Sequence, residues 1–398
     1  MIIKTYKYKL YSSKKNKHLN TQTKICGNIY NHCISLKKRY YKMYSVSFNK
    51  FKLQKHLTKL KKLDRYSFWS KVGSQSIQDI TDRIEKGYTS FFKNCKKKTK
   101  VRKVNPPSFK KVRSYSSFTF KQAGFKLLPF NQIKLNKRIY KYHKSREMEG
   151  EIKCVTVKRD SIGDWYIYFI CNLECNESER SDSKLKSISM TDKTAGFDFG
   201  CSTFLTVTSI TKNTNENIRK HSKITSPLFF KQSKNKISKA NKSLSKKVKG
   251  SNNYKKAKLN LARTHKKIKN QRHDFHFKTA LDLCKNYDIM FFETLDIKSM
   301  MKEHGRKIND LGFSDFLNIL KFKAKVYGNT IHCIDKWFAS SKICNYCKYK
   351  NNDLKKWDKI WICPQCGIKH HRDENASDNI LDEGINELKN LELKKLKN

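Results

Sequence analysis

The sequence predicts an α/β chain in which a strand-rich lobe precedes a second domain that carries a cysteine ribbon. Three observations predict this fold class. Alternating strand patterns flank a long helical stretch in the first half, and a polar stretch at 172–192 then interrupts the chain. Two Cys-x2-Cys pairs lie near the C-terminus of a second half in which strand and helix patterns alternate. The 398 residues are enough for two or three domains of ordinary size.

The first half has strand patterns at both of its ends. The opening IIKTYKYKLY alternates apolar and polar residues, and the pattern returns in SFTF, IKLNKRIYKY, IKCVTVKRD and DWYIYFIC between residues 116 and 171. Between these ends, apolar residues recur three to four positions apart, as they do in amphipathic helices. We therefore expect a first domain over 1–192, with a helical insertion at about 20–98.

The second half alternates strands and helices. The stretch TAGFDFGCSTFLTVTSI predicts a strand, residues 255–287 predict one long basic helix, and the apolar run DIMFFETL predicts a buried strand bounded by charge. A helix at 313–327 and a short strand, NTIHCID, lead into the cysteine cluster. We expect a second domain over 193–398, with the ribbon at about 338–370.

The charge of the chain predicts an anionic partner. There are 88 Lys and Arg against 34 Asp and Glu, which leaves a formal net charge of +54 spread along the whole length. Such a field repels itself unless a polyanion compensates it, so nucleic acid is the first candidate. An anionic membrane is disfavoured, because no apolar run approaches the roughly 18 residues of a spanning helix. The N-terminus also has no apolar signal core with a cleavage site, so we do not expect secretion.

The thirteen cysteines divide into four that cluster and nine that are scattered singly. A disulfide scaffold is short and regularly spaced, which this chain is not. We predict a reducing compartment in which the single cysteines serve as small apolar residues. The single cysteines are Cys26, Cys33, Cys95, Cys154, Cys171, Cys175, Cys201, Cys284 and Cys333.

The clustered cysteines have the spacing of a zinc ribbon. Two Cys-x2-Cys knuckles separated by fifteen residues are expected to meet on one tetrahedral Zn2+ ion. Four thiolates leave no open coordination position, so this zinc is structural and cannot activate water. The predicted ligands are Cys344, Cys347, Cys363 and Cys366. The apolar residues expected to shield the metal are Trp357, Ile360 and Trp361.

Three carboxylates stand out in a chain with few acids. Asp198 lies on a strand between Gly196 and Gly200, Glu293 ends the apolar run IMFFE, and Asp373 stands where a helix begins after the ribbon. Each has an ordinary explanation: a turn former, a solvent-facing strand end and a helix N-cap, respectively. The alternative is a group of carboxylates that binds divalent ions and hydrolyses nucleic acid.

Taken together, an Asp on a first strand, a Glu at the end of a later buried strand and an Asp on a helix after the ribbon resemble the acidic order of RuvC-type nucleases in the RNase H-like fold. The second half is similar to the TnpB family of insertion sequences, whose relatives include Fanzor proteins and small type V CRISPR effectors. The similar stretches are GFDFG, KGSNNYKKAKLNLARTHKKIKNQRHDFHFK with Arg272 and Asp274, FFETLDIKSM, DKWFASSKICNYC and CPQCGIKHHRDENASDNIL. Weaker similarities occur in KTYKYKLY, IYNHC, PPSFKK, SFTF and GDWYIYF, so the resemblance covers nearly the whole chain.

The resemblance implies an RNA-guided, Mg2+-dependent DNA endonuclease of transposon origin, with guide RNA and target DNA as partners. Asp198, Glu293 and Asp373 would be its catalytic Mg2+ ligands, with Asp198 bridging two ions and each of the other acids completing one side. The first domain would be a wedge-type β-barrel lobe with a helical recognition insertion, which holds nucleic acid by backbone and shape. Aromatic residues of this lobe either stack on bases or pack in its core. They are Tyr40, Tyr41, Tyr44, Trp69 and Tyr115.

The chain departs from the family pattern at three positions. Lys348 stands where Gly commonly follows the first Cys-x2-Cys pair, Ala339 where Pro is usual, and Ser377 where a second Ala is usual. None of these changes removes a predicted ligand or carboxylate, but they leave the activity of this copy open.

Two other functions remain alternatives. A DDE-like transposase orders its acids Asp, Asp, Glu, whereas this chain has the order Asp, Glu, Asp with a ribbon before the last. A catalytically inactive zinc-ribbon protein would bind nucleic acid without cutting it. The expected location is the nucleoid-associated cytoplasm of a bacterium, or the nucleus or viral factory of a eukaryote or its virus.

Overall fold

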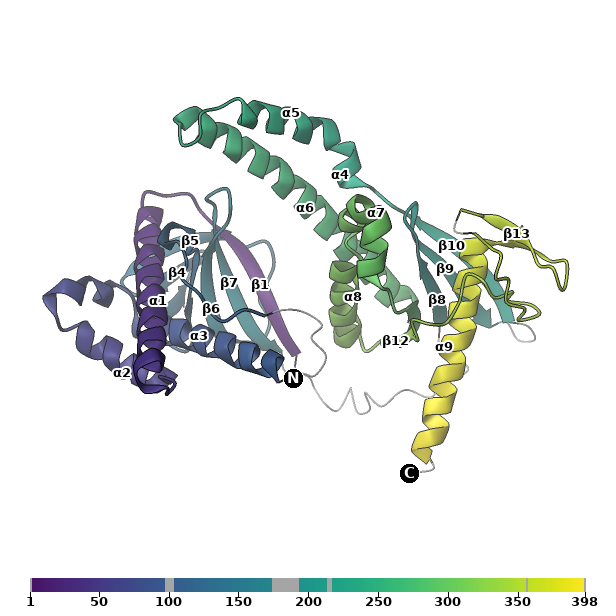
Figure 1. Ribbon diagram of the computed structural model, residues 1–398, viewed down its shortest axis with the longest axis horizontal. Coiled ribbons are helices and arrows are strands. Elements are labelled where there is room, and N and C mark those ends of the chain that lie inside the picture. The colour runs from purple at the N-terminus through teal and green to yellow at the C-terminus, as the bar shows by residue number, and fades with distance from the viewer. Residues whose placement is uncertain (1, 97–103, 174–192, 213–216, 356, 397–398) are drawn as a thin grey trace. The chain divides into compact units, whose positions relative to one another are not determined.

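The computed structural model divides the chain into two compact units, Met1–Cys175 and Asn176–Asn398 (Figure 1). The predicted linker at 172–192 falls almost wholly outside the described residues. The structure describes residues 2–96, 104–173, 193–212, 217–355 and 357–396.

The first unit is built on a seven-stranded antiparallel sheet with the order β2-β6-β7-β1-β5-β4-β3. Strand β1 pairs along its length with β7 but meets β5 only at Lys9 and Leu10, so the sheet divides there in a barrel-like arrangement. The strands are β1 (Ile2–Leu10), β2 (Ser117–Phe120), β3 (Phe125–Leu128), β4 (Gln132–Leu135), β5 (Arg138–His143), β6 (Glu151–Arg159) and β7 (Trp165–Leu173).

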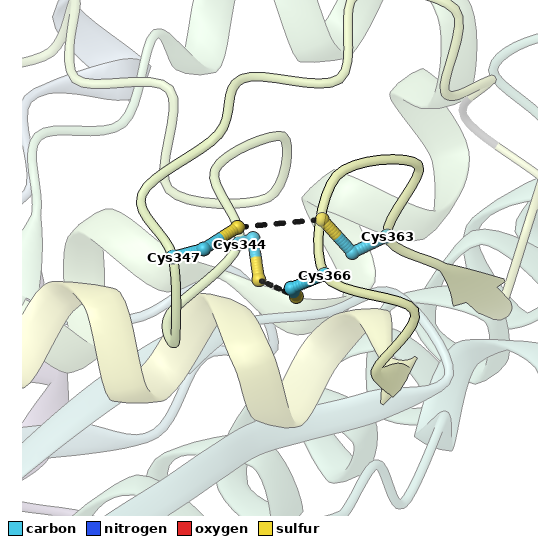
Figure 2. A group of neighbouring side chains, drawn as sticks. All are labelled: Cys344, Cys347, Cys363 and Cys366. Carbon is cyan, nitrogen blue, oxygen red and sulfur yellow. Dashed lines mark hydrogen bonds between the residues drawn. The ribbon is translucent and has the colours of Figure 1, made fainter.

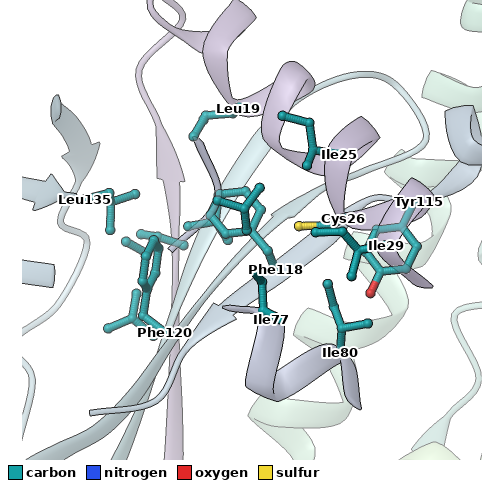
Figure 3. Packing of buried hydrophobic residues seen from close by; sticks show 14 of the residues in the cluster. Leu19, Ile25, Cys26, Ile29, Ile77, Ile80, Tyr115, Phe118, Phe120 and Leu135 are labelled. Carbon is teal, nitrogen blue, oxygen red and sulfur yellow. The ribbon is translucent and has the colours of Figure 1, made fainter. Parts of the chain in front are cut away.

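Helices are inserted between β1 and β2 and cover the apolar face of this sheet. They form because apolar residues recur on one side of each helix, and those residues are buried. In Figure 3, Ile29 of α1 and Ile77 of α3 point into the core that contains Phe118 and Phe120 of β2. The inserted elements are α1 (Asn16–Tyr44), α2 (Lys50–Leu60), the 3-10 helix η1 (Asp64–Lys71) and α3 (Ser74–Cys95), and a short η2 (Val112–Ser114) precedes β2.

The second unit contains a mixed five-stranded sheet with the order β10-β9-β8-β11-β12. The first three strands are antiparallel neighbours, whereas β8, β11 and β12 run parallel. The ribbon adds a two-stranded sheet of β13 and β14. The strands are β8 (Thr194–Phe199), β9 (Thr203–Lys212), β10 (Asn217–Thr225), β11 (Ile289–Glu293), β12 (Thr330–Ile334), β13 (Ile360–Ile362) and β14 (Lys369–His371).

Helices pack on both faces of the five-stranded sheet. One face packs with α6, α7 and α8 around Phe197, Phe292 and Phe316. The other face is covered by α9, whose Ile380 and Leu381 pack with Phe291. The helices are α4 (Phe229–Gln232), α5 (Lys234–Ser245), α6 (Asn252–Asn286), α7 (Ile297–Leu311), α8 (Phe313–Tyr327) and α9 (Arg372–Leu396).

Several sequence expectations can be compared with the described residues. All twelve described cysteines are free thiols, and of the eight single cysteines among them Cys95 is the exposed one. Cys175 lies outside the described residues. Trp69 and Tyr115 are 3% and 6% exposed and pack in the core, which rules out base stacking by these two rings as they stand. Among the described helices, none combines the length and apolar character needed to span a membrane.

Candidate functional site

Strand alternation brings Asp198 and Glu293 to the same face of the second sheet. Phe197 of β8 and Phe292 of β11 are register partners, and their rings stack at 4.6 Å on the face that packs with α6 to α8. Because successive side chains of a strand point to opposite faces, the next residues in both strands point to the face covered by α9. Adjacent strands lie about 4.8 Å apart, so these two acids are lateral neighbours at the ends of β8 and β11.

Asp373 joins them from the first turn of α9. This helix begins at Arg372, directly after β14, so the last strand of the ribbon continues into the helix without a loop. Asp373 accepts a hydrogen bond from Lys359 Nζ at 2.9 Å, and Arg372 Nε lies 3.9 Å from its other oxygen. The three predicted acids therefore come from β8, β11 and α9, three elements far apart in the sequence.

The electrostatics of the group follow from its burial. Burial raises the pKa of Asp198 well above its usual range, and the negative charges of Glu293 and Asp373 raise it further. Arg372 and Lys359 act in the opposite direction. Burial also raises the pKa of Glu293 to about 7. Buried carboxylates that repel one another favour a bound proton or cation, and carboxylate oxygens are ligands of hard divalent ions. Among the described residues, however, the potential metal ligands that lie within 4.8 Å of one another are the four ribbon cysteines, and the three acids are more widely spaced.

Two glycines allow α9 to lie directly on the sheet. A Cβ atom on Gly196 of β8 would come within 2.5 Å of Ser377 O and 2.7 Å of Leu381 Cβ. A Cβ atom on Gly384 of α9 would come within 2.1 Å of Phe291 Cδ1. Both approaches are closer than any side chain tolerates. The atoms that approach Gly196 so closely belong to the helix that carries Asp373.

The four ribbon cysteines converge as a metal site (Figure 2). Their sulfur atoms all lie within 4.8 Å of one another, with 3.7 Å between Cys344 and Cys366 and 3.5 Å between Cys347 and Cys363. A tetrahedral zinc ion with Zn–S bonds of about 2.3 Å separates its sulfurs by about 3.8 Å. The sulfur cluster therefore fits a zinc ion with little movement.

Backbone and side-chain donors surround these sulfurs. The N–H groups of Tyr346 and Cys347 point at the Cys344 sulfur, and those of Gln365 and Cys366 point at Cys363. Such donors stabilise thiolates, the form of cysteine that binds metal. A further neighbour, which no sequence pattern indicates, is the His370 ring, whose Nε2 lies 3.0 Å from Cys344 Sγ. In its Nε2-protonated form this ring donates a hydrogen bond to the ligand.

The apolar cover of the ribbon is smaller than expected. Trp361 is 6% exposed and packs with Cys344 and Cys363. Trp357 and Ile360, however, are 74% and 49% exposed, so the prediction that they shield the metal was wrong. The reason for Ile360 is the period of two in β13, which turns only the central Trp361 toward the sulfurs.

Asparagines fasten the first knuckle to α9. Asn375 Nδ2 donates to Ile343 O at 2.7 Å, and Asn375 Oδ1 accepts from the backbone N–H of Asn345 at 2.9 Å. Asn379 Nδ2 donates to Ser340 O at 2.8 Å and to Ile343 O at 2.6 Å. Both helix asparagines are 2% exposed. Their role was missed because no local pattern shows which loop a helical Asn will contact.

Two of the departures from the family pattern have visible consequences. Lys348 adopts a left-handed conformation, with φ of 61°. This conformation costs a residue with a side chain roughly 1 kcal/mol, whereas glycine adopts it without that cost. Lys348 Nζ lies 3.3 Å from Asp382 Oδ2, which offsets part of that cost. Ser377 is fully buried, but its Oγ lies 2.7 Å from Thr208 Oγ1 and donates to Glu374 O at 2.8 Å, so its hydroxyl is satisfied.

Arg272 and Asp274 of α6, which belong to the stretches similar to the TnpB family, make contacts away from the three acids. Arg272 Nη1 donates to Asn309 O at 2.7 Å near the end of α7. Asp274 pairs with Lys278 at 2.9 Å on the exposed surface of α6. These contacts are structural or surface interactions of the helices.

Comparisons with known proteins agree with the resemblance seen in the sequence. Residues 176–304 match the OrfB_IS605 family, described as "Probable transposase", and residues 313–380 match the Cas12f1-like TNB domain. A protein of Streptomyces pristinaespiralis, named as a candidate RNA-guided DNA endonuclease, is 28% identical over 83% of this chain and 76% of its own length.

A viral relative and a solved structure extend the comparison. A TnpB-like protein of Acanthamoeba polyphaga mimivirus is 26% identical over 75% of this chain and 54% of its own length. The structure of the mini-RNA-guided endonuclease CRISPR-Cas phi3 is similar in fold, with a TM-score of 0.50, 10% identity and coverage of 96% of this chain and 92% of that one. The two family matches and the curated relatives together make this chain similar to the TnpB family over most of its length.

Proposed function

We propose that this chain is an RNA-guided DNA endonuclease of transposon origin that hydrolyses phosphodiester bonds at a RuvC-like site. Its catalytic residues are Asp198, Glu293 and Asp373. The observation that carries the proposal is that β8, β11 and α9 bring these acids to one face of a mixed sheet, near enough for Glu293 and Asp373 to raise the pKa of Asp198. The RNase H-like fold that we assign to the second unit is supported by the same sheet, which combines antiparallel and parallel neighbours.

The donor set supports Mg2+ as the catalytic ion. Carboxylate oxygens are the ligands that Mg2+ prefers, and the raised pKa values of Asp198 and Glu293 indicate a site that needs positive charge. Bound Mg2+ would activate water and neutralise charge on the scissile phosphate. Asp198 and Glu293 are held rigidly by strands, whereas Asp373 depends on the placement of α9. We assign Zn2+ to the four ribbon cysteines as a structural ion.

The partners we propose are a guide RNA and its target DNA. The net charge of +54 supports binding to a polyanion, and the names of several relatives describe RNA-guided DNA endonucleases. We assign residues 1–192 to a nucleic-acid-binding lobe and residues 193–398 to the nuclease domain. In the first of these, Tyr41 and Tyr44 are 63% and 58% exposed and remain available to stack on bases.

The decisive experiment is purification of the chain together with co-expressed RNA. Sequencing that RNA identifies the guide, and matched DNA is then incubated with Mg2+. We expect cleavage by the parent and none by Asp198→Ala, with equal RNA content in both preparations. Equal cleavage by the two proteins would overturn the catalytic assignment. Binding without cutting by the parent would favour an inactive nucleic-acid-binding protein, and joined rather than cut strands would favour a transposase of the DDE type.

A further inference from the structure

Three acids of α9 pair with three side chains of β10, the edge strand of the second sheet, through two ion pairs and one hydrogen bond to a histidine ring. The acids lie four residues apart on the helix, and their partners lie two residues apart on the strand. The pairs are Lys223 with Glu374 at 2.6 Å, His221 with Asp378 at 3.0 Å and Arg219 with Asp382 at 2.6 Å.

The repeat of the helix matches the repeat of the strand. Four residues of an α-helix rise about 6 Å, and two residues of a β-strand rise about 6.6 Å. Each acid therefore lies beside a different base, and Asp378 also lies 3.6 Å from Arg219 Nη1. A helix that slid by a few ångströms along β10 would strain all of these pairs at once. These contacts fix the position of α9 along its own axis. Apolar contacts have no preferred direction, so they define that position less sharply than the three polar pairs do.

The last of these acids, Asp382, also binds the ribbon. Its Oδ2 accepts from Asn345 Nδ2 at 2.8 Å and lies 3.3 Å from Lys348 Nζ. Arg219 Nη1 donates to Asn345 Oδ1 at 3.0 Å, which closes a ring of three side chains. Asn345 directly follows the zinc ligand Cys344. One carboxylate thus connects the sheet edge, the helix and the first knuckle.

We propose that Asp382 is a positioning residue that couples the zinc ribbon to the placement of Asp373. It lies nine residues beyond Asp373 on the same helix, so it acts through the helix and the knuckle, not on the substrate. The coupling has two consequences. Loss of Asp382 loosens the knuckle that holds zinc, and it lets the first turn of α9 shift relative to Asp198. The second consequence rests on the proposed nuclease function, whereas the first does not.

The test uses the full chain with its co-expressed RNA and the variants Asp382→Ala and Asp382→Asn. Zinc release is followed with a chromogenic chelator in excess, and cleavage is measured as a function of Mg2+ concentration. For Asp382→Ala we expect about tenfold faster zinc release and about a tenfold higher Mg2+ concentration for half-maximal cleavage. Asp382→Asn keeps the acceptor oxygen for Asn345 but loses the charge, so an intermediate effect is expected. It also provides a folded variant if Asp382→Ala is insoluble.

Glu147→Ala is the matched control, because it removes a carboxylate that is 83% exposed and pairs with Lys144 on the first unit. It should leave both measurements unchanged. Unchanged zinc release in both Asp382 variants would overturn the proposal. A lower maximal rate with unchanged Mg2+ dependence would overturn the coupling to Asp373. If the parent does not cut DNA but zinc release accelerates in Asp382→Ala, the proposed nuclease function is wrong. The role of Asp382 in holding the first knuckle is then still supported.

Discussion

Lys359 Nζ lies 2.9 Å from Asp373 Oδ2, so a basic side chain of the ribbon neutralises an acid of the candidate catalytic group. The contact is reinforced through the backbone, since the Arg372 N–H donates to Lys359 O at 2.9 Å. Lys359 also lowers the pKa of Asp198, against the larger raising effect of burial. The ribbon therefore contributes charge to the site as well as holding the helix that carries Asp373.

Lys359→Ala should tighten the binding of divalent ions to the protein without nucleic acid. The ammonium group competes with an ion for the same carboxylate oxygen, and its removal favours the ion. Because Lys359 is 59% exposed, the ion pair contributes about 1 kcal/mol or less, which corresponds to at most a fivefold change in affinity. Titration calorimetry with Mn2+ measures it. Lys355→Ala is the control, since it removes an equal charge four residues away. Equal affinities of the two variants would contradict the competition.

Glu293→Gln should stabilise the protein at high pH when no divalent ion is added. Burial raises the pKa of Glu293 from 4.5 to about 7, so the folded protein holds this proton where the unfolded chain has lost it. The folded state therefore binds more protons between pH 4.5 and 7, and its stability falls as pH rises through this window. The amide has no such dependence, so its advantage should grow to the order of 3 kcal/mol above pH 8.

Denaturant unfolding of parent and Glu293→Gln at pH 5 and pH 8 tests this dependence. Glu147→Gln, on an exposed side chain, is the control and should follow the parent at both values. A constant difference between parent and Glu293→Gln across the pH range would show that the carboxyl of Glu293 does not hold an extra proton in the folded state.

Cys363→Ser and Asp373→Ala should both abolish cleavage, but for different reasons. The serine variant loses a proposed zinc ligand, and because structural zinc contributes to folding, its zinc content and thermal stability should both fall. The alanine variant should keep one zinc per chain and an unchanged melting temperature within a few degrees. Metal analysis and thermal unfolding separate the two. Cys201→Ser, a thiol outside the cluster, should resemble the parent in every measurement.

The parts of the site that follow local patterns were predictable from the sequence. The Cys-x2-Cys spacing predicts a sulfur cluster, and the helix predicted at 313–327 has the bounds of α8. The positions of Asp198 and Glu293 at strand ends follow from the apolar runs that precede them. In each case the signal lies within a few residues of the feature it predicts, so one sequence suffices.

The contacts that join these parts could not be predicted in the same way. Asn379 and Ser340 are 39 residues apart, and Arg219 and Asp382 are 163 residues apart. Helix and strand repeats relate only residues close in sequence, so they do not predict these pairs. Helix α7 was not predicted, although Ile297, Met300 and Ile308 recur at roughly helical spacing and Gly305 is the one residue that weakens the pattern. Tertiary packing of Ile308 and Leu311 stabilises that helix in the fold.

Gly196→Ala should separate α9 from the sheet and damage the acid group without touching any acid. The new methyl carbon would lie 2.5 Å from Ser377 O, so the helix must move away from β8. Overpacking of this kind costs about 1–3 kcal/mol, and the displaced helix carries Asp373 with it. We expect a lower denaturant midpoint and weaker Mn2+ binding than in the parent. Gly305→Ala is the control, because nothing lies within 4 Å of its added Cβ and alanine favours the helix by about 1 kcal/mol. If Gly196→Ala bound Mn2+ as tightly as Gly305→Ala, the close packing of α9 on β8 would not be what positions Asp373.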